Sequence, residues 1–285
     1  MQFEFAGVLP LVDGRYLARS LDAEEQESVL VLRQVGAPHV GARRRRRARE
    51  VEAEEGPRAL ALTRATAIRA FSPFPDLAAA ARWLDEACEA EDTIDVLVSD
   101  GLALLNRALH AQSVAAANPN SKAELEVEAA ERVLIGFGSG EEVADGRFTE
   151  AREIDTRPRT SRRQRREEEL RPQERVAAVL RGRELLDACE TLLLRARADL
   201  DAGRDREAAL QLRVGLEALL VELKDALSDP GHEEDMGTLN ERKTEAGAAA
   251  NAALQGDLTN DQHNQIEELL KLSERVLRRR RILHG

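Results

Sequence analysis

Aromatic residues are scarce in this sequence, whose 285 positions include one Trp, one Tyr and six Phe. A surface that stacks nucleic-acid bases needs several exposed rings, and a large all-β sandwich usually uses aromatic side chains in its core. The scarcity argues against both classes and favours a largely helical architecture. Hydrophobic residues still make up 42% of the chain, which is enough to bury a core.

Long hydrophobic runs and cysteine clusters are also missing. The longest apolar stretches, such as residues 219–221, fall far short of the roughly 20 residues of a spanning helix. The N-terminal segment MQFEFAGVLPLVDG has no basic region before its apolar residues, which argues against a signal peptide. We therefore expect a cytoplasmic protein with no membrane partner.

Cys88 and Cys189 lie far apart with no neighbouring Cys or His, so we expect two reduced thiols.

The chain has an excess of negative charge, with a formal net charge of −11 at pH 7. A global negative field opposes approach to phosphate, although a local arginine patch can still bind it. Only four of the 42 basic residues are lysines, so arginine is strongly preferred throughout the sequence. Runs of arginine therefore carry less functional meaning here than in most proteins.

Residues 1–155 predict a small α+β domain with a mainly antiparallel sheet. Alternating patterns predict strands over residues 3–9, 15–19, 28–35, 59–71 and 132–137. The Asp13-Gly14 turn signal predicts that the first two strands form a hairpin. We expect helices after Pro75 and after a cap at Thr93, the second being central and largely buried, and a weakly helical segment over 141–154. The Arg-rich stretch near 36–57 predicts a disordered loop.

The rest of the chain predicts a charged linker over residues 156–171 and an antiparallel four-helix bundle over 172–285. The first helix should run from Pro172 to Ala202, with Gly203 stopping it. Its seam residues Val179, Leu186, Leu193 and Leu200 repeat every seven positions. The other helices are expected from Asp205 to before Pro230, over 239–254, and from a cap at Thr259 or Asn260. The predicted fold class is therefore α+β.

The first helix of this bundle predicts an interaction surface. At 1.5 Å per residue it would be about 45 Å long, which is several turns more than the second helix can cover. The uncovered turns contain Val176, Val179 and Leu180, which would form an exposed apolar patch. We predict these three residues as an interface for the N-terminal domain or for a second copy of the chain.

Glycines at 136, 138 and 140 follow the predicted strand 132–137, where backbone amides could cradle a phosphate. Glu141 and Glu142 would repel that phosphate, and no Walker lysine follows. A small-ligand or nucleotide site at residues 136–140 is therefore the third functional hypothesis. No pair among the five histidines has metal-ligand spacing, so the sequence predicts neither a metal nor a cofactor.

Two arginine clusters are candidate contacts to nucleic-acid phosphates. Their residues are Arg43, Arg44, Arg45, Arg46, Arg47, Arg162, Arg163, Arg165 and Arg166. Acidic runs adjoin both clusters, which also fits a solvated loop and a linker. A third run at 278–281 fits a helix C-terminus, where cations complement the helix dipole.

The chain ends in RVLRRRRILHG, in which Arg279 and His284 have an Arg-x4-His spacing. Together with the hairpin ADLDAGRDREAALQLRVGLEALL, this end resembles the higher-eukaryote and prokaryote nucleotide-binding (HEPN) domains. Those domains are helical bundles whose ribonuclease members use an Arg-x4-6-His motif within a helix, whereas His284 is the penultimate residue here. The resemblance covers about a hundred residues and implies ribonuclease activity. The hairpin is equally similar to one tetratricopeptide unit, but no repeat of about 34 residues recurs.

These spacings do not assemble a nucleophile, a base and an orienting partner. We therefore expect a non-enzymatic interaction or scaffold protein that acts through its C-terminal helical bundle, with a protein partner or by self-association. The alternative is a nucleic-acid-associated protein that uses the arginine clusters, with HEPN-like ribonuclease activity.

Overall fold

The computed structural model describes residues 1–19, 27–36, 61–69, 73–118, 120–121, 124–155, 172–224 and 229–284, with side chains up to 281. The chain forms two compact units, Met1–Arg159 and Thr160–Gly285. The first contains a sheet and the second contains helices, so the fold class is α+β as predicted. Among the described helices, none combines the length and the apolar character needed to cross a bilayer.

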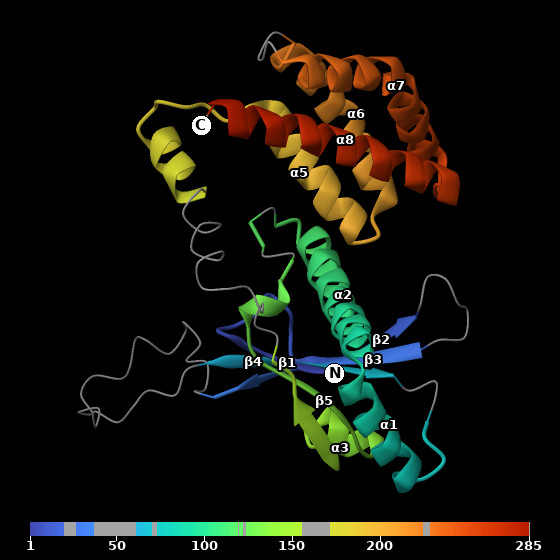
Figure 1. The fold of residues 1–285 in the computed structure, drawn as a ribbon. Helices are drawn as coiled ribbons and strands as arrows, with labels where there is room; N and C mark the ends of the chain where they lie inside the picture. Colours follow the sequence, from blue (N-terminus) through green and yellow to red (C-terminus); the bar gives the residue numbers. More distant parts are fainter. Residues whose placement is uncertain are drawn as a thin grey trace, which may run out of the picture. The chain divides into compact units, whose positions relative to one another are not determined.

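A six-stranded antiparallel sheet forms the centre of the first unit (Figure 1). Its strands are β1 (Gln2–Ala6), β2 (Gly14–Arg19), β3 (Glu27–Val35), β4 (Leu62–Arg69), β5 (Ala130–Phe137) and β6 (Glu150–Glu153). They lie in the order β2-β3-β4-β1-β5-β6. The predicted hairpin of β1 with β2 is therefore wrong. β2 pairs with β3, and the Asp13 carboxylate accepts a hydrogen bond from the Gln34 backbone N–H of β3 at 3.0 Å.

One face of the sheet is covered by α1 (Leu77–Glu89) and α2 (Glu91–Ala115). Phe3 and Phe5 of β1 point to this side, where they pack in a cluster with α2 residues. Gly101 of α2 permits the close approach, because a Cβ there would lie 3.0 Å from the Phe3 ring. α2 is amphipathic rather than largely buried as predicted, since Val96 and Val114 are exposed on its outer side.

The helix starts lie two to three residues from the predicted ones. α1 begins at Leu77 and is capped by the Asp76 carboxylate, which accepts a hydrogen bond from the Ala79 N–H at 2.7 Å. α2 begins at Glu91, so Thr93 lies inside its first turn and does not cap it. Adjacent acidic residues at the start of α2 favour that earlier beginning, because they complement the positive end of the helix dipole.

Residues 138–149 connect β5 to β6 and fold over the second face of the sheet; we call this segment the strap. It contains the short helix α3 (Gly140–Ala144), and β6 follows it. The prediction of a helical segment over 141–154 is therefore confirmed for residues 141–144 and wrong for the residues of β6. Val143 and Ala144 of α3 are buried. α3 contacts β4, which places the strap over the middle of the sheet.

The glycines at 136 and 138 have a packing role in this arrangement. A Cβ on Gly136 would lie 2.5 Å from the backbone oxygen of Glu150, and a Cβ on Gly138 would lie 2.8 Å from the Val143 side chain. The space next to these glycines is therefore filled by the strap and by β6. A Cβ on Gly140, in contrast, would meet nothing within 4 Å.

We expect Gly136→Ala to destabilise the protein by about 1–3 kcal/mol, because the added methyl group must push the β6 backbone away. The matched control is Gly140→Ala, which should change the free energy of unfolding by less than about 0.5 kcal/mol. Urea denaturation of the two variants and the native chain measures both effects. Equal stabilities of the two variants would contradict the packing role of Gly136.

The described residues of the second unit form four long helices and one short one. The long helices are α5 (Ala188–Asp201), α6 (Asp205–Glu222), α7 (Pro230–Gln255) and α8 (Asn260–His284), and the short helix covers residues 172–180. α6 contacts α5, α7 and α8 (Figure 1). The core between these helices is built mainly from leucine and alanine. Alanines 246, 249, 250 and 253 are buried on α7, so this helix approaches its neighbours closely. α7 also starts earlier than predicted, at Pro230 after the Asp229 cap.

The predicted continuous helix from Pro172 to Ala202 is wrong, because the helical chain is interrupted over residues 181–187. Gly182 takes a left-handed conformation with a φ of 68°. Its N–H bonds to the Val179 carbonyl at 2.9 Å, and the Arg183 N–H bonds to the Ala178 carbonyl at 2.9 Å. This pair of bonds is the Schellman motif that ends helices at glycine. The predicted seam residue Leu186 consequently lies outside the core.

The N-terminal amine of Met1 belongs to the sheet. It donates a hydrogen bond to the Ala67 carbonyl at 2.9 Å, and the Ala67 N–H donates to the Met1 carbonyl at 2.8 Å. Burial, with a smaller effect of the nearby Arg69 cation, lowers the pKa of this amine from 8.0 to about 5. The amine is therefore neutral in the folded chain at neutral pH.

Stability should consequently fall as the pH decreases from 8 to 5, because the unfolded amine binds a proton in this range and the folded amine does not. The loss is at most about 4 kcal/mol, and it is complete below the folded pKa. Urea denaturation between pH 5 and pH 8 measures it. A chain with a Gly-Ser dipeptide before Met1 moves the titrating amine away from Ala67 and should show a weaker pH dependence. Identical pH profiles of the two chains would contradict the assignment.

Candidate functional interface

The candidate interface is the segment of residues 172–187, which we call the apolar segment. Of the three predicted interface residues, Val176 is 55% exposed, Leu180 is 82% exposed and Val179 is half-buried. The sequence prediction missed Leu185 and Leu186, which are 81% and 60% exposed. Four large aliphatic side chains within eleven residues thus face away from the core of the C-terminal unit.

Ion pairs connect the apolar segment to the bundle. The Arg175 guanidinium donates to Glu190 at 2.7 Å and to Glu184 at 2.6 Å, and these carboxylates raise the pKa of Arg175 above its ordinary value. Asp187, the last residue of the segment, accepts a hydrogen bond from Arg280 of α8. Charged contacts therefore fix the position of the segment and leave its aliphatic side chains uncovered.

The arginine run at 278–281 also takes part in internal ion pairs. Arg279 donates to the Asp235 carboxylate at 2.7 Å, lies 3.6 Å from Asp229, and packs so closely on Gly231 that a Cβ there would meet the guanidinium at 2.9 Å. Arg281 lies 3.7 Å from Glu190. Arg279 is the arginine of the Arg-x4-His spacing, and its contacts give it a structural role between α7 and α8. The side chain of His284 lies outside the described residues.

We expect Arg279→Gln to lower the free energy of unfolding by about 1–3 kcal/mol, because it leaves the buried Asp235 carboxylate without its closest partner. Arg278→Gln provides the matched control on the exposed side of the same helix turn and should cost less than about 0.5 kcal/mol. Thermal or urea denaturation distinguishes them. A stability of the Arg279 variant equal to that of the Arg278 variant would contradict the structural role.

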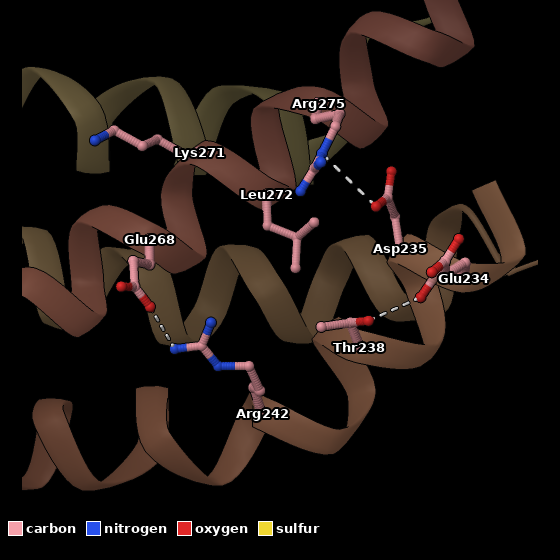
Figure 2. A pocket seen from close by; sticks show the side chains of 8 residues that line it. All are labelled: Glu234, Asp235, Thr238, Arg242, Glu268, Lys271, Leu272 and Arg275. Atoms are coloured by element: carbon pink, nitrogen blue, oxygen red, sulfur yellow. Dashed lines mark hydrogen bonds and ion pairs between the residues drawn. The ribbon is translucent and has the colours of Figure 1, made fainter. Parts of the chain in front are cut away.

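A shallow cleft of about 420 Å³ lies between α7 and α8 (Figure 2). Its lining residues are Glu234, Asp235, Thr238, Arg242, Glu268, Lys271, Leu272 and Arg275. Each of the three cations has a carboxylate partner: Arg242 pairs with Glu268 at 3.1 Å, Lys271 with Glu267 at 2.7 Å, and Arg275 lies 3.6 Å from Asp235. The Thr238 hydroxyl donates to the Glu234 carbonyl. Paired charges of both signs make this cleft a poor site for a single anion or cation.

Two histidines and the cysteine of the second unit each have a different partner. His232 is buried with its Nε2 atom 3.2 Å from the Leu223 carbonyl, and His263 contacts the Asp205 carboxylate at 3.1 Å through Nδ1. Burial, together with the Glu222 carboxylate, raises the pKa of Cys189 to about 12, so its thiol is protonated at neutral pH. The described residues contain no group of three side chains suited to a metal ion.

The predicted nucleic-acid contacts Arg43 to Arg47, Arg162, Arg163, Arg165 and Arg166 all lie outside the described residues. The same holds for residues 37–57 of the expected loop and for the expected linker 156–171, so those domain boundaries stay a prediction. Searches against family models, curated proteins and solved structures find no match for this chain. Its function has to be argued from the geometry described above.

Proposed function

We propose that this protein is a non-enzymatic, cytoplasmic interaction or scaffold protein that self-associates through its C-terminal helical unit. The observation that carries the proposal is the exposure of Val176, Leu180, Leu185 and Leu186 in one short segment. Burying a large aliphatic side chain contributes roughly 1.5–3 kcal/mol, so four of them can supply the apolar centre of an interface.

The charges of the apolar segment favour a second copy of the chain as its binding partner. The segment contains three acidic residues, Glu174, Glu184 and Asp187, and three arginines, at 175, 181 and 183. It is therefore neutral, whereas the whole chain has a net charge of −11. A two-fold interface brings the same patch of each copy together, so this neutral, mixed-charge patch avoids the repulsion that other surfaces of the chain would cause.

The length of the first helix also favours docking. A helix of nine residues, 172–180, is marginal in isolation, because helices shorter than about 12–15 residues gain too little from their own hydrogen bonds. Packing of Val176 and Leu180, which lie four residues apart on one helix face, against a second copy would stabilise it. The apolar segment would thus form the dimer interface, and its short helix would in turn be stabilised by dimerisation.

The nucleic-acid alternative rests on the arginine clusters and on the HEPN resemblance. Arg279 is the one residue of the Arg-x4-His spacing whose side chain is described. It is held between Asp235 and Asp229, which favours a structural role over a ribonuclease role. The glycine-loop hypothesis is weakened by the side chains and backbone that fill the space beside Gly136 and Gly138. We therefore rank self-association first.

Size-exclusion chromatography with light scattering tests the proposal on the full chain. We expect twice the monomer mass for the native protein and the mass of one chain for the double variant Val176→Glu with Leu180→Glu, because four buried charges would be uncompensated in the dimer. The matched control is Val214→Glu with Val221→Glu, which changes two exposed aliphatic residues of α6. The control should remain dimeric.

Two results would contradict self-association through this segment. One is a monomeric mass for the native chain at a concentration of about 100 μM, which is high enough to populate even a weak dimer. The other is a dimer that survives in the Val176/Leu180 variant. Circular dichroism of each variant confirms that the helices are retained, since all four substituted side chains are exposed.

A further inference from the structure

A cluster of arginines lies under the strap on the second face of the sheet. Arg15 of β2, Arg33 of β3 and Arg64 of β4 come from three adjacent strands, and the register pairs Arg33 directly with Arg64. Arg15 pairs with Val31, which is two residues from Arg33 and therefore points to the same face. We call these three residues the sheet arginines.

A different residue of the strap lies next to each of the three sheet arginines. Glu141 accepts two hydrogen bonds from Arg15, at 3.1 and 2.8 Å, and Asp145 accepts one from Arg33. Gly146 lies over Arg64, with a φ of 76°, and a Cβ there would lie 2.6 Å from the guanidinium. Arg64 itself pairs with Glu4 of β1 at 2.8 Å. Glu141 and Asp145, which we call the strap carboxylates, thus cover Arg15 and Arg33.

These ion pairs contribute little to the stability of the fold. The side chains of Arg15 and Arg33 are half-exposed and Glu141 is almost fully exposed, and pairs of this kind contribute about 0–1 kcal/mol. The strap is held instead by its buried residues Val143 and Ala144, and by the Thr149 N–H, which donates to the Phe137 carbonyl at 2.9 Å. The strap carboxylates can therefore rotate away while the strap backbone stays in place.

We propose that the sheet arginines form a binding site for the phosphodiester backbone of nucleic acid, which the strap carboxylates occupy as internal competitors. Guanidinium groups match phosphate oxygens in the same two-pronged geometry in which Arg15 now holds Glu141. Arg147 of the strap, which lies 3.5 Å from Asp145, adds a fourth cation at the edge of the site. A bound phosphate would take the place of each strap carboxylate on Arg15 and Arg33, while Arg64 stays paired with Glu4 beside the site.

The extent of the site favours a polymer of phosphates over a single phosphate ion. Arg15 and Arg33 lie on adjacent strands and two residues out of register, which separates their Cα atoms by about 8 Å, so two consecutive phosphates replace the two strap carboxylates better than one ion does. Contacts of this kind are made to the backbone and carry no base specificity. The site lies wholly within the N-terminal unit, so it requires neither the apolar segment nor self-association.

Fluorescence anisotropy with a labelled single-stranded oligo(U) tests the proposal on the full chain. Removal of the competing charges in Glu141→Gln with Asp145→Asn should tighten binding about tenfold, and the slope of log K against log salt should steepen by about 1.4 for two more phosphate contacts. The control Glu86→Gln with Glu89→Gln makes the same change in net charge on exposed residues of α1. It should change the affinity by less than about twofold, with the slope unchanged.

Adding Arg15→Gln and Arg33→Gln to the strap variant should restore the weak binding and the shallow salt slope of the native chain. Glu141→Gln alone, at a position exposed enough not to affect folding, should give part of the gain. The proposal is overturned if the control gains as much affinity as the strap variant, or if the gain survives loss of both arginines. Binding of the strap variant to anionic lipid vesicles but not to oligo(U) would also overturn it.

Discussion

The left-handed turn at Gly182 determines which apolar side chains of the C-terminal unit stay uncovered. Its two capping bonds, from the N–H groups of Gly182 and Arg183, end the first helix at residue 180. α5 then starts afresh at Ala188, so Leu193 and Leu200 enter the core while Leu186 remains exposed. The candidate interface exists because this turn separates residues 172–187 from the seam of the bundle.

Arginine has two different roles in the two units. In the bundle, Arg279 and Arg280 join helical elements through the carboxylates of Asp229, Asp235 and Asp187. On the sheet, the pairs of Arg15 and Arg33 are half-exposed and add little stability. Because arginine is common throughout this sequence, the sequence alone does not separate structural arginines from those free to bind a ligand. The burial of each arginine and its ion-pair partners separate them.

Local patterns predicted the fold class and several element ends. The strand at 132–137, the stop at Gly203 and the cap at Thr259, whose hydroxyl accepts from the Gln262 N–H, are all confirmed. Local patterns could not predict the strand pairing, because β1 pairs with β4 and β5, which lie far from it in the sequence. Gly182 could have been recognised, since Gly203-Arg204 makes the same capping bonds as Gly182-Arg183. The seven-residue repeat from Val179 to Leu200 instead favoured one continuous helix through Gly182.

Amide hydrogen exchange measured at two protein concentrations tests the central claim, which is that the apolar segment of one copy is covered by another. We expect peptides from residues 172–187 to exchange more slowly as the concentration rises through the dimerisation range, because docking stabilises a helix that is marginal alone. Peptides from the outer face of α6 around Val214 should not change. Exchange in 172–187 that is fast and independent of concentration would contradict the account.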